Sequence, residues 1–202
     1  MSAAKNTWRI YERDVDIVLA EEFSINSDFA SWVLSKTSKF QGRVAEVEDV
    51  HVSLANSDGE SDLVIIHKEK NSPQRFAILV ENKIDAIFQP NQALRYEIRG
   101  QAGSQLSSWS EFEHILFAPE SYLKIYDGDH GFSSALSYEA IRDWLENYSE
   151  NSRIRYRAAF FCQAIPQGRS AYVRTKDQLT DAFWSSAYLY KNSNRLTVAA
   201  RG

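Results

Sequence analysis

A carboxylate and an ammonium close a short apolar run at residues 78–83, which has the sequence ILVENK. Side chains two positions apart on a β-strand project to the same face, so Glu81 and Lys83 would point together while Asn82 points to the other face. Such a pair could hold a cation and stabilise charge on an anion if further polar groups reach the same place. The chemistry of the pair therefore depends on what the preceding strand brings beside it.

The preceding strand supplies a second carboxylate. The segments SDLVIIHKEK and RFAILVENK flank the polar stretch KNSPQ and predict a long β-hairpin with its apex near Ser72. Positions 62 and 81 are equally distant from the centre of this turn, so Asp62 is expected to face Glu81. Opposed residues of an antiparallel pair have Cβ atoms about 5 Å apart. Asp62, Glu81 and Lys83 should thus crowd one edge of a sheet.

These three side chains suggest a reaction. Two carboxylates this close repel each other unless a cation lies between them or one of them carries a proton. Oxygen ligands suit a hard cation such as Mg²⁺, which commonly takes one or two protein carboxylates and fills its octahedron with water and substrate phosphate. A neighbouring lysine can orient the attacking water or stabilise charge on the phosphate. The grouping therefore suits metal-assisted hydrolysis of a phosphodiester.

The elements that must position these residues follow from hydrophobic periodicity. Apolar residues at helical spacing predict two helices near the start of the chain, the second entered at Ser27 with Phe40 in its apolar stripe. The second hairpin strand is almost continuously apolar, which predicts a central place in its sheet. Further segments predict strands at 43–54 and 114–119, a helix after Pro90, and helices at 137–148, 153–165 and 177–190. This order indicates a mixed sheet packed against helices.

Length and composition indicate one globular domain. The chain has 202 residues, of which 44% are hydrophobic and 25% charged, enough to bury a full core. We expect a single domain over residues 1–190 and a C-terminal tail at 191–202. The formal net charge of −4 means that an anionic partner must meet a local basic patch or a bound metal. The arginine run at 153–157 could form such a patch, although a solvated helix start is the simpler interpretation.

Cysteine usage and hydropathy indicate the compartment. The chain has one cysteine, Cys162, so it forms no internal disulfide, which fits a reducing cytoplasm. The apolar surroundings AAFFCQAI predict a buried, inert thiol. The first residues lack an apolar signal region, and no run approaches the roughly 18 apolar residues of a membrane span. We therefore expect a soluble cytoplasmic protein that does not contact the membrane.

The combined motifs resemble those of the PD-(D/E)XK nuclease superfamily. An acid opens one strand at Asp62, and an acid-x-lysine motif closes the next strand at Glu81 and Lys83. The helix that follows carries a Gln-x-x-x-Tyr motif at Gln92 and Tyr96. The residue before the first acid is a serine where the name of the family has a proline. The order and the intervals nevertheless match the family pattern.

This resemblance implies a fold and a reaction. The fold is the α/β restriction-endonuclease-like fold, with an αβββαβ core whose mixed central sheet is flanked by helices, here reaching to about residue 119. The reaction is metal-dependent hydrolysis of DNA by an endonuclease, with Mg²⁺ as cofactor and Mn²⁺ able to replace it. Asp62, Glu81 and the backbone carbonyl of Asn82 would bind the metal. Lys83 would position the hydrolytic water, and Gln92 would orient the site or the substrate.

Further residues are candidates for substrate and metal contacts. Gln92, Tyr96 and Arg99 recur at helical spacing on one face, and Tyr96 and Arg99 are candidates for binding the substrate. Arg95 is a further candidate because a basic side chain could meet a phosphate. In some relatives an acid of the first helix completes the metal site, and Glu22 is the candidate here because it shares a face with apolar residues. Two other acids of that helix compete with it, Glu12 and Glu21.

Other functions remain open or lack support. DNA is the expected partner, and a homodimer is a further expectation. A nuclease fold without catalytic activity could instead bind nucleic acid or protein, since a fold does not dictate a function. In a third alternative the Glu81 and Lys83 motif is a plain ion pair in another fold, with Asp62 remote from it. The sequence contains no zinc-ligand spacing, no Walker A motif and no G-x-S-x-G motif.

Overall fold

The computed structural model describes residues 9–56, 59–89, 91–126 and 130–170. The helix predicted at 177–190, the domain boundary at residue 190 and the tail at 191–202 lie outside these ranges. Within them, no helix is long and apolar enough to cross a membrane.

A five-stranded mixed sheet forms the centre of the fold. Its strands lie in the order β1-β2-β3-β4-β5, so β3 is the middle strand, as its apolar sequence predicts. β1 to β3 pair antiparallel, whereas β3 with β4 and β4 with β5 pair parallel. The strands are β1 (Ala45–Asn56), β2 (Gly59–Glu69), β3 (Arg75–Asn82), β4 (Glu111–Ala118) and β5 (Ser134–Ser137).

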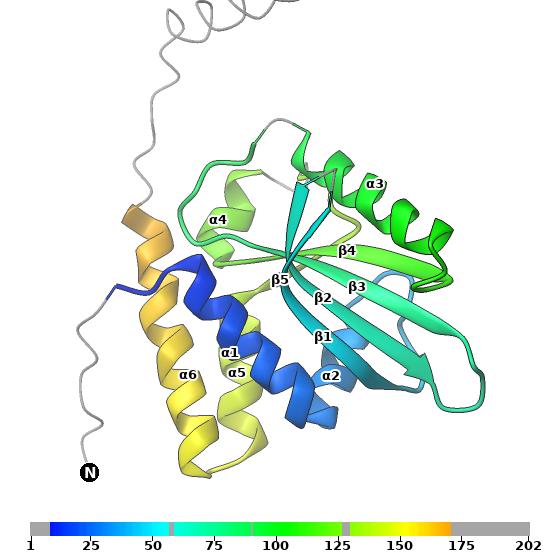
Figure 1. Cartoon of the computed structure of the whole chain (residues 1–202). Coiled ribbons are helices and arrows are strands. Elements are labelled where there is room, and N and C mark those ends of the chain that lie inside the picture. The colour runs from blue at the N-terminus through cyan, green and yellow to red at the C-terminus, as the bar shows by residue number, and fades with distance from the viewer. Residues whose placement is uncertain (1–8, 57–58, 90, 127–129, 171–202) are drawn as a thin grey trace, which may run out of the picture. The chain divides into compact units, whose positions relative to one another are not determined.

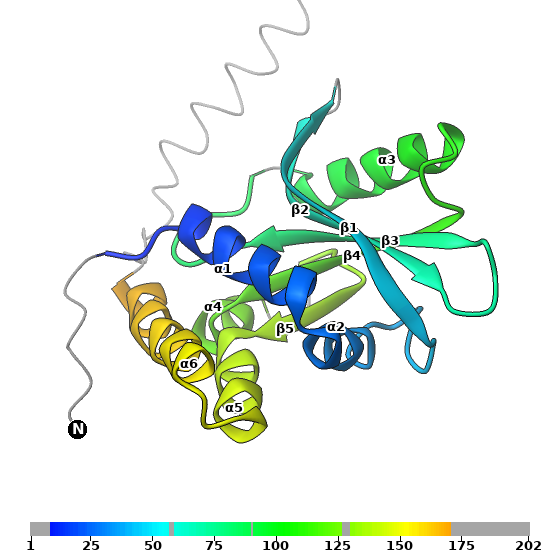
Figure 2. The same ribbon diagram turned by 60° about the horizontal axis from the view of Figure 1, so that its bottom comes forward.

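Helices cover both faces of the sheet (Figures 1 and 2). Helix α3 lies on one face, whereas α1, α2, α5 and α6 lie on the other. The succession of α1, β1 to β3, α3 and β4 is the predicted αβββαβ order, so the predicted fold class is confirmed. The helices are α1 (Glu12–Ile25), α2 (Ser27–Leu34), α3 (Gln92–Gln105), α4 (Glu120–Ile125), α5 (Tyr138–Tyr148) and α6 (Ser152–Ala164), followed by a 3-10 turn at Ile165–Ser170.

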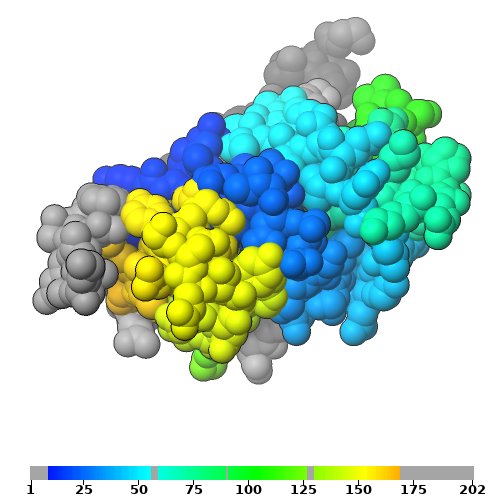
Figure 3. Space-filling model, turned by 90° about the horizontal axis from the view of Figure 1, so that it is seen from below, coloured from blue at the N-terminus to red at the C-terminus, as the bar shows by residue number. Residues whose placement is uncertain are grey.

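Ion pairs join α1 to α6. Figure 3 shows the yellow atoms of α5 and α6 against the blue atoms of α1 and α2. The carboxylate of Glu22 is fully buried, pairs with Arg153 and lies 3.7 Å from Nε of Arg157, while Glu21 also pairs with Arg157. Two of the three arginines in the run at 153–157 therefore bind acids of α1. That part of the run joins two helices instead of forming the phosphate-binding patch considered from the sequence.

Helix α2 is shorter than its apolar stripe predicts. It ends at Leu34, although Phe40 is buried as expected and packs 4.3 Å from the ring of Phe76. The hydroxyls of Ser35 and Thr37 donate to backbone carbonyls near the helix end, at 2.6 and 2.7 Å. Side-chain hydrogen bonds of this kind compete with helix continuation, which explains the early end.

The sequence did not predict α4 or β5, and it misplaced Cys162. Both missed elements are short, and β5 has only four residues with little apolar pattern. Cys162 is exposed and not buried. It follows the buried residues Phe160 and Phe161 on α6, and the next position on the helix turns away from the core by about 100°. An apolar run alone therefore does not bury every residue of a helix.

A neutral histidine lies in the core between β2 and the helices. His67 is fully buried, stacks on Phe76 with ring centroids 5.0 Å apart, and has no hydrogen-bond partner for either ring nitrogen among the described residues. Burial lowers the pKa of His67 to about 4, and the backbone of Ile65 raises it only in part. The structure therefore holds this ring in its neutral form at physiological pH.

We expect His67→Leu to reduce acid destabilisation. The unfolded chain binds more protons than the folded protein between pH 6.5 and about 4, so stability is complete above that range and falls as the pH drops through it. This difference costs the parent about 3 kcal/mol at pH 4, a cost that leucine removes. Urea unfolding of both proteins at pH 7 and pH 4 measures it. Equal losses of unfolding free energy in the two proteins would refute the role of His67.

Candidate active site

The hairpin has the register that the sequence predicts. β2 and β3 pair from Lys68 opposite Arg75 to Leu63 opposite Val80, and the next step of this register sets Asp62 opposite Glu81. The backbone N–H of Asn82 donates to Oδ2 of Asp62 at 2.8 Å. The two carboxylates therefore lie at one end of the sheet. The alternative in which Asp62 is remote from Glu81 is wrong.

A polar cleft of about 670 Å³ opens at this end of the sheet. Its walls come from α1, from β2 and β3, and from α3. The acids that line it are Glu12, Asp16, Glu60, Asp62 and Glu81, and the basic residues are Arg13, Lys83, Arg95 and Arg99. The acids outnumber the basic residues, so an anionic ligand would gain from a cation bound in the cleft.

Glu81 is the centre of the contacts at the base of the cleft. Its Oε1 lies 2.5 Å from Nζ of Lys83, and Nε2 of Gln92 donates to the same oxygen at 2.5 Å. Oε1 of Gln92 in turn accepts the backbone N–H of Gln89 at 3.1 Å. Because both the amino group and the carbonyl oxygen of the Gln92 side chain form hydrogen bonds, α3 holds the Glu81 carboxylate in one orientation. Gln92 thus reaches Glu81 and Lys83, as the sequence predicts.

Lys83 is charged at neutral pH. Its side chain is 9% exposed, and Nζ also lies 3.9 Å from Oε2 of Glu12. Burial alone would lower the pKa of Lys83, but the attraction of Glu81 and Glu12 outweighs burial and raises it above the ordinary value. An ammonium that keeps its proton can orient water or neutralise an anion, but it cannot accept a proton as a general base.

The acids of the cleft repel one another. Burial, followed by the charges of Glu81 and Asp16, raises the pKa of Asp62 to about 8. Burial also raises the pKa of Asp16 to about 6 and that of Glu12 above its ordinary value. Such crowded oxygen ligands suit a hard divalent cation, which would relieve the repulsion. Among the described residues, no group of three or more acidic, histidine or cysteine side chains is arranged to hold a metal by itself.

Asn82 points to the opposite face from its two neighbours, as the strand periodicity predicts. Its Nδ2 donates to Oδ1 of Asp16 at 2.5 Å, and its Oδ1 accepts from the hydroxyl of Tyr138 at 3.4 Å. Both contacts are buried and fix the last residue of β3 against α1 and α5. These two contacts fix the orientation of the backbone that carries the side chains of Glu81 and Lys83. The role of the Asn82 carbonyl as a metal ligand stays a prediction.

Helix α3 supplies the remaining predicted residues. The hydroxyl of Tyr96, which is 1% exposed, donates to the Val80 carbonyl at 3.0 Å and accepts the N–H of Asp62 at 3.2 Å. Tyr96 thus links the two strands beneath the carboxylates. Arg99 stacks on its ring at 4.1 Å and donates through Nε to Oγ of Ser61 at 2.9 Å. Ser61, the residue before Asp62, therefore anchors Arg99 beside the cleft.

Arg95 occupies a more open position. Its Nη2 donates to Oε1 of Gln89 at 2.8 Å at the rim of the cleft, and the residue is half-buried. A guanidinium at this place could reach a phosphate of a bound strand. The proposed substrate contacts of Arg95, Arg99 and Tyr96 remain predictions, and the burial of Tyr96 favours a positioning role for it.

The prediction of Glu22 as a further ligand does not fit its position. Glu22 does not line the cleft, and its carboxylate binds Arg153 and accepts from Asn26 at 3.1 Å. The acids of α1 that line the cleft are Glu12 and Asp16. Glu12 accepts the backbone N–H of Ile84 at 3.0 Å, which ties α1 to the residue after Lys83. The burial of Glu22 was foreseen, but its partners come from α6, which the sequence did not place beside α1.

Six cleft residues were not foreseen as members of the site. Asp16 and Arg13 come from α1, Ser53 from β1, Gly59 and Glu60 from β2, and Gln89 precedes α3. Glu12 and Asp16 are four residues apart and so lie on one face of α1, a spacing that could have identified them as a pair. The sequence held no comparable signal for Arg13, whose Nη1 donates to Ser53 at 2.5 Å across the cleft wall.

For the metal-assisted phosphodiester hydrolysis that the sequence predicts, we expect Gln92→Ala to lower turnover while leaving the fold intact. The variant loses the hydrogen bond that orients Glu81, and a bond to a charged group contributes enough to slow the reaction about 10-fold or more. Cleavage rates and thermal unfolding of the variant, beside Gln105→Ala at the exposed end of the same helix, measure both effects. Cleavage by Gln92→Ala at the parental rate would remove this residue from the mechanism.

Comparison with known proteins adds little at the sequence level. No family model matches the chain, and no curated protein matches it. Among solved structures, the chain is similar to the MspJI restriction endonuclease in complex with a 27-mer oligonucleotide, with a TM-score of 0.37 and 10% identity. The match covers 85% of this chain and 40% of that one, so the chain spans less than half of that protein's length. A similarity this low carries no functional argument.

Proposed function

We propose that the protein is a metal-dependent nuclease of the PD-(D/E)XK type that hydrolyses phosphodiester bonds of DNA. The observation that carries the proposal is the meeting of Asp62, Glu81 and Lys83 at the base of one polar cleft, with Nζ of Lys83 2.5 Å from Glu81. A buried and a half-buried carboxylate beside a charged lysine at adjoining strand ends suit metal-assisted phosphodiester hydrolysis.

The chemistry of the donor atoms supports a divalent cation. Asp62 and Glu81, with the backbone carbonyl of Asn82, would hold Mg²⁺, and Mn²⁺ would replace it because both accept oxygen ligands. The pKa of Asp62 is raised to about 8 because burial and the charges of Glu81 and Asp16 outweigh the attraction of Lys83, so a further cation beside this carboxylate would be favoured. When bound, the metal would polarise the phosphate and lower the pKa of a bound water.

The residues of the chain supply binding and orientation. Lys83 keeps its proton, so it would hold the attacking water or stabilise charge on the phosphate rather than remove a proton. Gln92 holds the Glu81 carboxylate in place. Arg95 and Arg13, at the rim, would contact phosphates on either side of the scissile one.

A cleavage assay tests the proposal. Plasmid, linear duplex, single-stranded DNA and RNA are incubated with the protein and Mg²⁺, with Mn²⁺, or with chelator. We expect metal-dependent cleavage of DNA that chelator abolishes, and nicking of closed circles would identify an endonuclease. Absence of cleavage on every substrate, together with retained binding of nucleic acid, would instead support the alternative of a catalytically inactive nuclease-fold binding module.

A further inference from the structure

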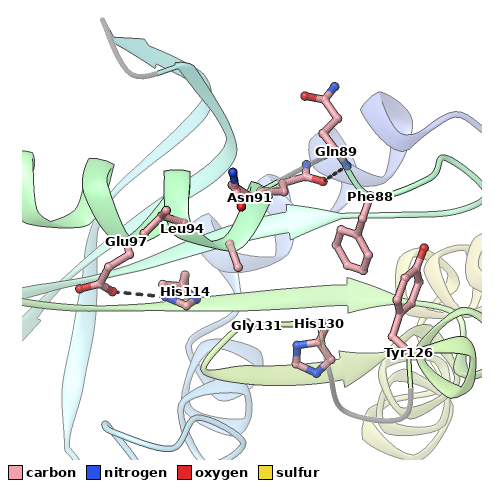
Figure 4. Close-up of a pocket in the computed structure, with 11 residues that line it drawn as sticks. Phe88, Gln89, Asn91, Leu94, Glu97, His114, Tyr126, His130 and Gly131 are labelled. Carbon is pink, nitrogen blue, oxygen red and sulfur yellow. Dashed lines mark hydrogen bonds and ion pairs between the residues drawn. The ribbon is translucent and has the colours of Figure 1, made fainter. Parts of the chain in front are cut away.

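A second cavity adjoins the cleft at the start of α3 (Figure 4). It is open to solvent, has a volume of about 550 Å³, and is bordered by the first turns of α3, by β4, by the segment before α3 and by residues between α4 and β5. Gln89 and Gln92 line both this cavity and the cleft. A strand whose phosphate enters the cleft would therefore carry a neighbouring nucleotide past the mouth of the cavity.

Aromatic rings form one end of the cavity. Figure 4 shows Phe88 and Tyr126 side by side at this end, and their ring centroids are 4.6 Å apart. Both residues are half-buried, and the buried ring of Phe132 lies beneath, 6.0 Å from Phe88. The planes of Phe88 and Tyr126 cross at 73°, so the two rings meet edge to face. Partly exposed aromatic rings of this kind are groups on which unpaired bases stack.

Polar groups form the other end. Nε2 of His114 lies 3.3 Å from Oε2 of Glu97, an interaction that faces the cavity in Figure 4. Asn91, at the start of α3, has a left-handed backbone with φ of 57°, a conformation that asparagine adopts more readily than most residues, and its side-chain amide belongs to the lining. A carboxylate and an amide are the groups that pair with the exocyclic amines and ring nitrogens of bases.

The lining suits a flat heterocycle better than a phosphate. None of the described residues that line the cavity is a lysine or an arginine, and its single acid is Glu97, which lies beside His114. A phosphate would therefore gain little electrostatic attraction there. The volume lies in the range of about 300–1,000 Å³ that is typical of small-molecule pockets, so it accepts a nucleobase with room for its sugar.

We propose that this cavity binds one unpaired nucleobase of the substrate strand, next to the phosphate held in the cleft. The inference rests on the proposed nuclease function and specifies its substrate. A base can enter the cavity only when it is unpaired and unstacked, so the protein should prefer DNA that is single-stranded at the site of cleavage. Stacking on Phe88 and Tyr126 would supply affinity without selecting one base, and Glu97 would favour bases with an amine.

A cavity-filling variant tests the proposal. Leu94 lines the cavity and is 55% exposed, so Leu94→Trp would place an indole in the space of the base. Ile98, one turn further along α3 and 41% exposed, lines none of the cavities described, and Ile98→Trp is the matched control. Both variants keep the residues of the cleft. Binding is measured in chelator, so that the result does not depend on cleavage.

The probes are a labelled single-stranded oligodeoxynucleotide, the same strand with abasic residues throughout, and the corresponding duplex. In fluorescence anisotropy we expect the parent and Ile98→Trp to prefer the strand with bases, and Leu94→Trp to lose about 10-fold of that preference, the size of one base-stacking contact. Duplex affinity should change little.

The outcomes separate this proposal from the proposed function. Equal preference for bases in Leu94→Trp and Ile98→Trp, or no binding of the single strand by the parent, would overturn the base pocket. Cleavage with Mg²⁺ is measured separately on the parent. A protein that binds bases through the cavity yet cleaves nothing would disprove the nuclease function alone, and one that cleaves only paired DNA would overturn the pocket alone.

Discussion

Replacement of Lys83 by methionine is expected to lower the rate of DNA cleavage by about 100-fold or more, the usual cost of losing a group that stabilises charge in the transition state. Divalent affinity should stay the same or increase. Lys83 contributes no ligand, and its ammonium lies 2.5 Å from Glu81, where it competes with a cation for the carboxylate. Methionine keeps the apolar stem of the lysine, so packing is preserved while the charge is lost.

Three measurements decide this prediction. Calorimetry with Mn²⁺ gives the affinity for the metal, a gel-shift assay gives the affinity for DNA, and nicking of closed circular DNA gives the rate. Lys70→Met, in the exposed turn of the same hairpin, is the matched control and should behave as the parent. Parental cleavage by Lys83→Met would remove the lysine from the mechanism, and lost metal affinity would mean that the variant disturbs Glu81.

The centre of the site could be predicted because it depends on local geometry. A hairpin with a short turn has one register when one face is apolar, so the position of Asp62 opposite Glu81 follows from counting residues on each side of the turn. The helical spacing of Gln92 and Tyr96 likewise fixes which face of α3 they share. The parallel pairing of β3 with β4 then follows from the helix between them.

The contribution of α1 could not be predicted in the same way. Several acids lie along this helix, and periodicity shows which of them share a face but not which end of the sheet that face meets. Which acids of α1 line the cleft depends on how the helix packs against α6, more than 120 residues later in the chain. Glu22 pairs with Arg153 of α6, whereas Glu12 and Asp16 line the cleft. Long-range packing of this kind has no signature in a single sequence.

The ends of α2 and the strand β5 could not be predicted for a different reason. β5 has four residues and gains its strand conformation by pairing with β4, so its own sequence need not favour a strand. In α2, by contrast, the apolar stripe continues beyond the helix because Phe40 reaches the core from a turn held by side-chain hydrogen bonds. Burial and helical conformation are separate properties, and hydrophobic spacing reports only the first of them.

Replacement of Asp62 by asparagine is expected to have two effects of opposite sign on stability. Without metal, the variant should unfold with a free energy about 1–3 kcal/mol higher than the parent at pH 9, because a pKa raised by several units implies a destabilising charge. The pKa of Asp62 is raised to about 8, so its protonated form stabilises the fold below the ordinary carboxylate range and this contribution is lost as the pH rises through 8. Asparagine has no charge to repel Glu81 and Asp16.

With metal, the order should reverse. At a Mg²⁺ concentration of about 100 times its dissociation constant, binding stabilises the parent by about 2.7 kcal/mol, whereas the variant lacks a charged ligand and should gain little. The rate of DNA cleavage by Asp62→Asn should fall together with its stabilisation by Mg²⁺. Urea unfolding with and without Mg²⁺ measures both effects, with Asp143→Asn, on an exposed part of α5, as the control. If Asp62 only stabilised the fold, its replacement would lower the stability of the metal-free protein and leave the response to Mg²⁺ unchanged. That result for Asp62→Asn would leave the proposed metal site without its first ligand.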